Sequence, residues 1–276
     1  MPALRGLSHH VLVQGRREES DLHLDPSDRA AVFDAIEQYR PTVVVNLVAA
    51  TNVDQCETQP QIAWRANAEV VAILTESIVA FGKKSGARPH LVHLSTDQVY
   101  GGPGPHAEDD VNLINVYALS KFTGELLAQR VDATVLRTNF YGRSRCPLRM
   151  SFSDWLVSNL REGSPITVFN DVKFSALHID TLCDVIAQCI DRRPVGIFNV
   201  GCRDSFSKAE FAFALAKALN LSTDQVSVGK STDAGLRARR PIDMSLQVSR
   251  LENILELQFP SMKAQIEHAA KEYLND

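Results

Sequence analysis

The sequence has no apolar run long enough to cross a membrane. A membrane-spanning helix needs about 20 predominantly apolar residues, and no stretch of this 276-residue chain approaches that length. The first residues also lack the apolar core of a secretory signal peptide. These absences argue against a membrane or secreted protein, and we expect a cytoplasmic one.

Charge of one sign is not in excess either. Lys and Arg number 29 against 33 Asp and Glu, which gives a formal net charge of -4. Electrostatic binding to nucleic acid or to acidic membranes requires a basic surplus, so we expect neither partner. Hydrophobic residues make up 45% of the chain, which is typical of a globular protein with a sizeable core.

Cysteine is scarce and scattered. The five cysteines are odd in number and lack the spacing of metal ligands, so we expect no metal site. Cys183 and Cys189 fall in an apolar helical stretch, where packing in the core is the preferred interpretation. Unpaired cysteines fit a reducing cytoplasm best.

The most informative absence is that of a glycine-rich turn near the N-terminus. A nucleotide-binding α/β sheet normally opens with a strand and such a turn, whose glycines let the backbone approach a pyrophosphate. No G-x-x-G-x-x-G pattern precedes residue 40, and residues 1–8 are typical of the end of the helix that would follow the turn. We therefore expect a strand, the turn and part of a helix to be missing upstream. Either an internal Met was taken as the start, or the element was lost.

What is present is a regular alternation of short apolar runs with amphipathic stretches. It predicts an α/β fold, a Rossmann-like doubly wound parallel sheet with a smaller C-terminal lobe. We expect strands at residues 11–13, 21–25, 42–49, 91–95 and 133–137, and helices at residues 28–40, 60–83 and 115–129. Beyond residue 139 the pattern is less regular, with helices at 152–161, 179–189 and 207–219 and strands at 166–168 and 197–200. Ser207 and Glu210 predict a capping box at the start of the last helix.

Polar residues follow the predicted strands at their ends. Asn46 and Ala49-Ala50-Thr51 follow one strand, Ser95-Thr96-Asp97 the next, and Thr138-Asn139 a third. Right-handed crossovers place the carboxyl ends of parallel strands along one edge, where ligands of such folds bind. We expect these residues to line that edge.

Tyr117 and Lys121 lie four residues apart on the predicted helix 115–129 and therefore share a face. A neighbouring ammonium favours the phenolate and lowers the pKa of a tyrosine. Such a phenol can protonate a carbonyl oxygen while a nicotinamide cofactor delivers hydride to the carbon. On spacing alone, a surface helix with an exposed tyrosine and a solvated lysine is an equally good interpretation. The preceding strand and its Ser-Thr-Asp end favour the catalytic one.

Arg16 and Arg17 follow the predicted strand at residues 11–13. Two guanidinium groups at this position can bind the 2′-phosphate of an adenosine, which favours NADP(H) over NAD(H). The alternative is a solvated turn beside Glu18 and Glu19.

With these motifs, the sequence resembles the extended short-chain dehydrogenase/reductases. Among them it is most similar to dTDP-4-dehydrorhamnose reductase and related sugar-nucleotide reductases, from about Leu4 to the C-terminus. The strongest stretches are Val44–Asp54, Leu94–Tyr100, Asn115–Lys121 and Leu136–Thr138. Together they are specific, although none is so alone.

The resemblance implies an NADP(H)-dependent reductase of a 4-keto group on a nucleotide-activated deoxysugar. Tyr117 would be the proton donor and would also contact the cofactor. Lys121 would lower the pKa of Tyr117 and bind the nicotinamide ribose, and Thr96 would hydrogen-bond the carbonyl oxygen. Residues Ala49–Thr51 would line the ribose and diphosphate of the cofactor. Asn67 would steady the adjacent strand and the cofactor.

The same resemblance implies the residues that meet the substrate. Asp97 would contact it, and Asn139 and Phe140 would lie where nicotinamide and sugar meet. Arg240 would bind the nucleotide diphosphate, with a salt bridge to Asp243 as an equal alternative.

The resemblance also implies a division of the chain. Residues 1–138 with about 170–200 would form the NADP-binding domain, and about 139–169 with 201–276 the substrate-binding lobe. The partner would be a nucleotide sugar, and the helices 60–83 and 115–130 are candidates for pairing in a homodimer.

Three residues qualify the resemblance. Gln98 stands where the rhamnose-pathway reductases carry Tyr, and Ala118 replaces a frequent Gly. His178, in the family's return from the lobe to the sheet, is better interpreted as structural than as functional. The alternatives are an epimerase or dehydratase of nucleotide sugars, or a non-catalytic regulatory subunit of the same fold, such as that of methionine adenosyltransferase.

Overall fold

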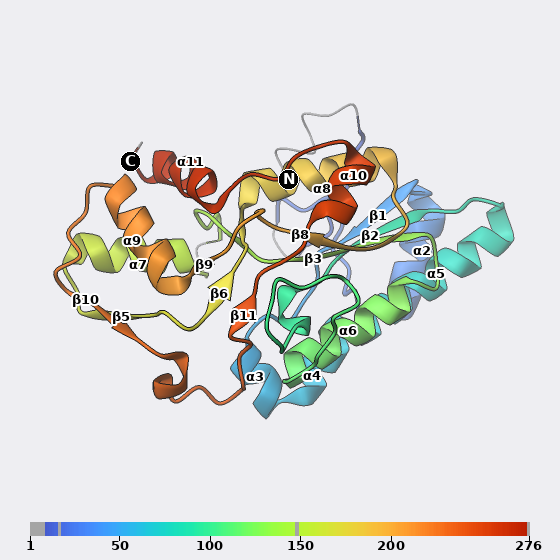
Figure 1. Ribbon diagram of the computed structural model, residues 1–276. Coiled ribbons are helices and arrows are strands. Elements are labelled where there is room, and N and C mark those ends of the chain that lie inside the picture. The colour runs from blue at the N-terminus through green and yellow to red at the C-terminus, as the bar shows by residue number, and fades with distance from the viewer. Residues whose placement is uncertain (1–8, 16–17, 147–148, 275–276) are drawn as a thin grey trace. The chain divides into compact units, whose positions relative to one another are not determined.

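The computed structural model describes residues 9–15, 18–146 and 149–274 (Figure 1). The chain divides into two compact units, which are described separately. The first consists of residues 1–95, 115–136 and 183–197, and the second of residues 96–114, 137–182 and 198–276.

A parallel sheet forms the centre of the first unit. Its strands are β1 (Val43–Asn46), β2 (His90–Leu94), β3 (Ala133–Thr138) and β8 (Gly196–Val200), in the order β1-β2-β3-β8. The division into units assigns the last residues of β3, from Arg137, and of β8, from Phe198, to the second unit. The first two pairs are parallel, with Val45 opposite Val92 and Val92 opposite Thr134. Because this agrees with the predicted topology, the Rossmann-like fold class is confirmed. All residues of β3 are buried, whereas Val43–Val45 of β1, at the end of the order, are only half-buried.

Helices pack against this sheet through an apolar core. The helices are α2 (Arg29–Tyr39), α5 (Val70–Ser85), α6 (Val116–Ala128) and α8 (Ile179–Arg192), and α5 lies beside α6 (Figure 1). Asp28 caps α2 by accepting hydrogen bonds from the amides of Ala30 and Ala31. The core of α2, α5, β2, β3 and the end of α6 consists of Val32, Ile36, Val71, Ile73, Ile78, Phe81, Leu91, Ala128, Ala133 and Val135.

The helix predicted at residues 60–83 is present, but it is not a regular α-helix throughout. The structure has short helices α3 (Val53–Thr58) and α4 (Pro60–Trp64), then a π-helical turn at Arg65–Glu69, and only then α5. Pro60 begins α4 at a position where proline suits a helix start. A π-helical turn holds one residue more than an α-helical turn, a feature that hydrophobic periodicity does not reveal. The end is as predicted, because Gly86 adopts φ 75° and terminates α5.

The two N-terminal strands predicted at residues 11–13 and 21–25 are not formed. A single parallel bridge joins Gln14 to Leu22. The Asp21 carboxylate accepts the amide hydrogen of Val13 at 2.9 Å, so a side chain takes the place of a strand neighbour.

The second unit contains three small sheets. Strand β5 (Ile166–Phe169) pairs with β10 (Val226–Gly229), and β4 (Phe140–Tyr141) with β7 (Leu177–His178). Strand β6 (Lys173–Phe174) lies between β9 (Phe206–Ser207) and β11 (Asp243–Met244). The helices of this unit are α7 (Phe152–Glu162), α9 (Lys208–Ala218), α10 (Ser249–Leu255) and α11 (Met262–Leu274).

The predictions for this region hold where local signals are strong. The capping box of Ser207 and Glu210 is present at the start of α9. Hydrophobic periodicity did not predict the helices α10 and α11.

Within the described ranges, no helix is both long enough and apolar enough to span a bilayer.

Gly124 on α6 marks a close approach of two helices. A Cβ atom there would collide with the carbonyl oxygen of Asn67 and lie 3.3 Å from Nε2 of His93. We predict that Gly124→Ala lowers the free energy of unfolding by about 1–3 kcal/mol, although alanine is the better helix former by about 1 kcal/mol.

Urea titrations followed by circular dichroism measure this difference. Gly102→Ala is the control, because the nearest atoms to its Cβ lie 4.0 Å away. A stabilised Gly124→Ala variant would show that the two helices are not in contact at this point.

Candidate functional site

Tyr117 and Lys121 lie in the first turns of α6, as predicted. Asn115 begins the helix, and its side chain accepts the amide hydrogen of Ala118 at 2.7 Å. The carboxylate of Glu57 accepts the amide hydrogen of Val116 at 3.0 Å. Tyr117 is 7% exposed and Lys121 only 2%. The alternative of an exposed tyrosine and a solvated lysine on a surface helix is therefore excluded.

The buried ammonium of Lys121 is held at the carboxyl end of β2. Its Nζ donates a hydrogen bond of 2.7 Å to the carbonyl oxygen of Leu94. Burial lowers the pKa of Lys121 to about 8, and the charge of Glu125 acts in the opposite direction. The hydroxyl of Ser95 donates to the carboxylate of Glu125 at 2.5 Å. Sequence reasoning missed Glu125, although it lies four residues beyond Lys121, on the same helix face.

The imidazole of His93 is also buried and is close enough to Lys121 to be affected by its charge. His93 is fully buried, and the side-chain amide of Asn46 lies 3.1 Å from its Nδ1. Burial lowers the pKa of His93 well below its usual value, and the charge of Lys121 lowers it further. A neutral His93 therefore adds no positive charge beside Lys121.

Asn67 joins α6 to the loop after β1. Its side-chain oxygen accepts the amide hydrogen of Ala50 at 2.8 Å, and its nitrogen donates to the Ala50 carbonyl at 3.2 Å. The same nitrogen donates to Ser120 Oγ at 2.9 Å, and Ser120 donates to the Tyr117 carbonyl at 2.8 Å. Asn67 thus holds the backbone of residues 49–51 in place. Sequence reasoning had not singled out Ser120.

The loop after β1 presents small side chains and accessible backbone. Ala49 and Ala50 are half-buried and Thr51 is exposed. Such a loop at the carboxyl end of a parallel strand suits a ribose or a diphosphate. Arg16 and Arg17 lie outside the described residues.

In the second unit, the structure brings Asp97 and Asn139 together. The Asn139 amide donates to the Asp97 carboxylate at 2.9 Å, and the Thr96 hydroxyl lies 3.4 Å from the same carboxylate. Burial raises the pKa of Asp97 to about 6, which the hydrogen bond from Asn139 opposes. Gln98 has a buried side-chain oxygen without a hydrogen-bond partner among the described residues.

Lys208, which sequence reasoning missed, lies near Asp97. Its Nζ is 3.6 Å from the ring centre of Phe174 and 4.4 Å from that of Phe152. Burial lowers the pKa of Lys208 to about 8, and the charge of Asp97 opposes this shift. A signal was present in the sequence, because a lysine directly after the N-cap Ser207 is unfavourable at the positive end of a helix dipole.

The remaining predicted residues of this unit have the following surroundings. Phe140 on β4 is 47% exposed. Arg240 donates to the carbonyl of Ala238 at 3.0 Å, and Asp243 accepts from the Ser245 hydroxyl. His178 is fully buried and lies 2.9 Å from Glu272 on α11.

Comparison with known proteins decides the family. A family model described as the RmlD substrate binding domain matches residues 3–275, nearly the whole chain. The chain belongs to this family. The sequence-based assignment to the extended short-chain dehydrogenase/reductases is thereby confirmed, and with it the enzyme class, an oxidoreductase.

Individual RmlD-family relatives differ in function. A Streptomyces antibioticus protein named "Probable dTDP-4,6-dihydroxy-2-methyloxan-3-one 4-ketoreductase" is 34% identical over 234 residues, covering 79% of this chain and 73% of its own. Methionine adenosyltransferase 2 subunit beta of Danio rerio is 28% identical over 235 residues, covering 82% and 70%. The crystal structure of dTDP-4-dehydrorhamnose reductase from Bacillus anthracis strain Ames in complex with NADP has a TM-score of 0.81 at 25% identity, covering 92% and 91%.

The buried ammonium of Lys121 gives this RmlD-family chain a characteristic pH dependence. Its pKa is about 8 in the folded chain and about 10.4 in an unfolded one. Between these values the unfolded state binds more protons, so stability rises with pH. We predict that the free energy of unfolding of the wild type, relative to Lys121→Met, increases by about 1–3 kcal/mol from pH 7 to pH 10.

Urea titrations at each pH measure this difference. Lys84→Met is the control, because Lys84 is exposed on α5 in an ion pair with Glu37. A difference between wild type and Lys121→Met that stays flat or falls with pH would show that the ammonium is well solvated.

Proposed function

We propose that this protein reduces the 4-keto group of a nucleotide-activated deoxysugar with NADPH. The observation that carries the proposal is the geometry of α6, where Tyr117 precedes a buried Lys121 anchored to the Leu94 carbonyl. Membership of the RmlD family and the NADP-bound relative support the same chemistry.

In the proposed reaction, bound NADPH supplies the hydride to the carbonyl carbon. Tyr117 donates its phenolic proton to the carbonyl oxygen, which becomes the hydroxyl of the product. The hydroxyl of Thr96 donates a hydrogen bond to the same oxygen and stabilises its developing negative charge. The charge of Lys121 favours the phenolate that Tyr117 leaves behind.

The cofactor is proposed to lie against the first unit. The Ala49–Thr51 backbone, held by Asn67, would meet the ribose and diphosphate. Lys121 would also bind the nicotinamide ribose. NADPH is proposed ahead of NADH because of Arg16 and Arg17.

The sugar and its nucleotide are proposed to lie against the second unit. The pair of Asp97 and Asn139 offers both an acceptor and a donor to sugar hydroxyls. The exposed ring of Phe140 offers an apolar face. Arg240 would meet the diphosphate.

Replacement of the proposed proton donor tests the proposal. With dTDP-4-dehydrorhamnose and NADPH, we predict that Tyr117→Phe loses 10²- to 10⁴-fold in kcat. Its affinity for NADPH should stay within about twofold of the wild type, because the phenol hydroxyl acts on the substrate. Consumption of NADPH by absorbance and binding by nicotinamide fluorescence are the measurements.

Tyr39→Phe is the matched control, because Tyr39 lies exposed on α2, and it should retain full activity. A Tyr117→Phe variant with wild-type turnover would contradict the proposed mechanism. Wild-type protein that binds NADPH without consuming it would instead favour a regulatory subunit, the alternative supported by the similarity to methionine adenosyltransferase 2 subunit beta. Conversion of the sugar without net oxidation of NADPH would favour an epimerase or dehydratase.

We further propose that two copies pair through the exposed apolar residues of α4, α5 and α6. These are Ile62 and Trp64 on α4, Val79 on α5, and Leu119 and Leu126 on α6, each at least 39% exposed. Pro60, Trp64 and Leu119 line a hollow of about 510 Å³. Apolar patches of this kind on a soluble chain commonly mark protein interfaces.

Light scattering during gel filtration tests this pairing. We predict a mass of twice 30.5 kDa for the wild type and a monomer for Leu119→Glu. Leu274→Glu is the control, because Leu274 is 61% exposed at the end of α11, and it should remain a dimer. A monomeric wild type at micromolar concentration would exclude this interface.

The cytoplasm is the proposed location. The five cysteines are odd in number and scattered along the sequence, which suits a reducing compartment.

A further inference from the structure

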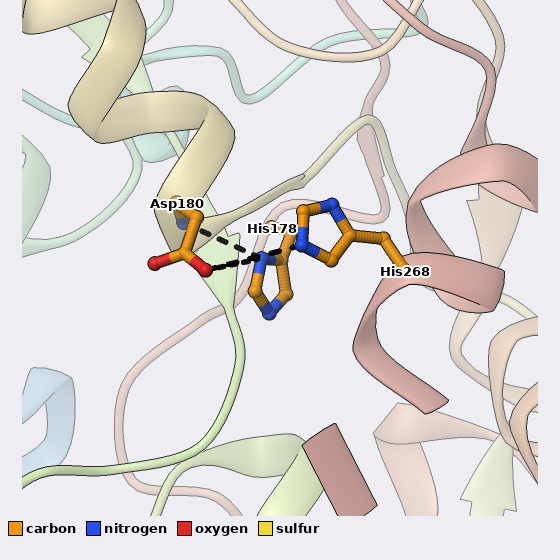
Figure 2. A group of neighbouring side chains, drawn as sticks. All are labelled: His178, Asp180 and His268. Carbon is orange, nitrogen blue, oxygen red and sulfur yellow. Dashed lines mark hydrogen bonds and ion pairs between the residues drawn. The ribbon is translucent and has the colours of Figure 1, made fainter. Parts of the chain in front are cut away.

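Three potential metal ligands meet in the second unit, and none of them is among the residues assigned to reduction. His178 ends β7, Asp180 lies in the first turn of α8, and His268 lies on α11. One donor atom from each lies within 4.8 Å of the other two. Figure 2 shows the Asp180 carboxylate directed at a ring nitrogen of His178, with the ring of His268 beside it.

His178 is oriented as a metal-binding histidine is. Its ring is fully buried, and Nε2 lies 2.9 Å from the carboxylate of Glu272. Because a carboxylate only accepts hydrogen bonds, Nε2 carries the proton and Nδ1 presents its lone pair. A carboxylate behind the distal nitrogen is the usual arrangement for a histidine that binds a metal ion.

The lone pair on Nδ1 of His178 takes part only in a weak hydrogen bond. It accepts a long hydrogen bond of 3.4 Å from the Asp180 amide. Oδ2 of Asp180 lies 3.9 Å from this Nδ1 and also 3.9 Å from Nε2 of His268. Both separations exceed direct hydrogen bonding, whereas two ligands of one tetrahedral zinc ion, each bound at about 2.1 Å, lie about 3.4 Å apart. A contraction of about half an ångström would bring the carboxylate to that spacing from each imidazole.

His268 can make the remaining adjustment. Its ring stacks on that of His178 with centroids 4.4 Å apart and planes inclined by 28°. Parallel rings do not aim their lone pairs at one point, so the His268 ring has to rotate. Its side chain is 45% exposed, which leaves it free to do so.

We propose that His178, Asp180 and His268 bind one divalent transition-metal ion, of which zinc is the best fit, with a fourth position open to water. Two imidazoles and one carboxylate suit zinc and its neighbours, whereas magnesium and calcium prefer oxygen ligands. The ion would connect the β7–α8 junction to the C-terminal helix α11. Metal binding would therefore stabilise the second unit.

The proposed site departs from the expectation of no metal from the sequence. That expectation considered ligands at short spacing, but His268 lies far along the chain from His178 and Asp180. The fold brings it there because α11 packs beside β7.

A nearby cation should weaken the site. Arg145 lies 3.9 Å from Oδ1 of Asp180, the oxygen that does not face the histidines. Its charge repels a metal ion and competes for the carboxylate, so its removal should tighten binding.

Calorimetric titration of the metal-stripped, full-length protein with zinc chloride tests the proposal. Cys146 and Cys183 are replaced by serine in every sample, so that thiols do not contribute. We predict one equivalent of zinc, at least tenfold weaker binding for His268→Ala and for Asp180→Asn, and severalfold tighter binding for Arg145→Ala. Magnesium chloride should give no binding at the same concentrations.

These variants are chosen because Asp180 and His268 are half-exposed, so both should fold, unlike a variant at the buried His178. The His23→Ala variant is the control and should bind as the wild type does. Zinc should raise the Tm of the wild type and of His23→Ala, but not of His268→Ala. Absence of zinc binding, or binding that His268→Ala and Asp180→Asn leave unchanged, would overturn the proposal.

Discussion

A buried ammonium is difficult to accommodate, and much of the first unit is arranged around that of Lys121. The group is compensated by the Leu94 carbonyl and by the charge of Glu125, which in turn binds Ser95. These partners come from the end of β2 and from α6, so the cation requires that strand and helix meet in one register. Asn67 then connects the same helix, through Ser120, to the loop after β1. The parts of the unit that are proposed to meet the cofactor are therefore joined by polar contacts rather than by apolar packing alone.

Features that rest on local sequence patterns could be predicted, whereas those that rest on contacts between residues distant in sequence could not. The strand at 91–95, the helix at 115–129 and the capping box of Ser207 rest on local patterns, and the structure agrees with them. The π-helical turn within the helix at 60–83 was not predicted, because one extra residue in a single turn is too small a change for hydrophobic periodicity to reveal. Lys208 and Glu125 were missed as partners because their roles arise from burial and from contacts distant in sequence. The cluster around His178 was missed for the same reason.

The second unit carries charges of its own in an apolar setting. Burial raises the pKa of Asp97 and lowers the pKa of Lys208, so the loss of hydration favours the neutral form of each. Each charge favours the other, so a bound ligand that displaces water from one affects the protonation of both. Groups with such displaced pKa values are commonly found where a protein meets its ligand. Asp97 is among the residues proposed to meet the sugar, so its protonation would respond to a bound substrate.

The π-helical turn at Arg65–Glu69 has a consequence for local motion. Helices ordinarily open from their ends, where hydrogen bonds are fewest. Here the wider turn lies in the interior of a long helical stretch, between α4 and α5, where it interrupts the regular i→i+4 hydrogen bonds. Amide hydrogens of this turn should therefore exchange with solvent sooner than those of α5, reversing the usual gradient from end to centre. The turn includes Asn67, the residue that holds the loop after β1, so opening of the turn would also release that loop.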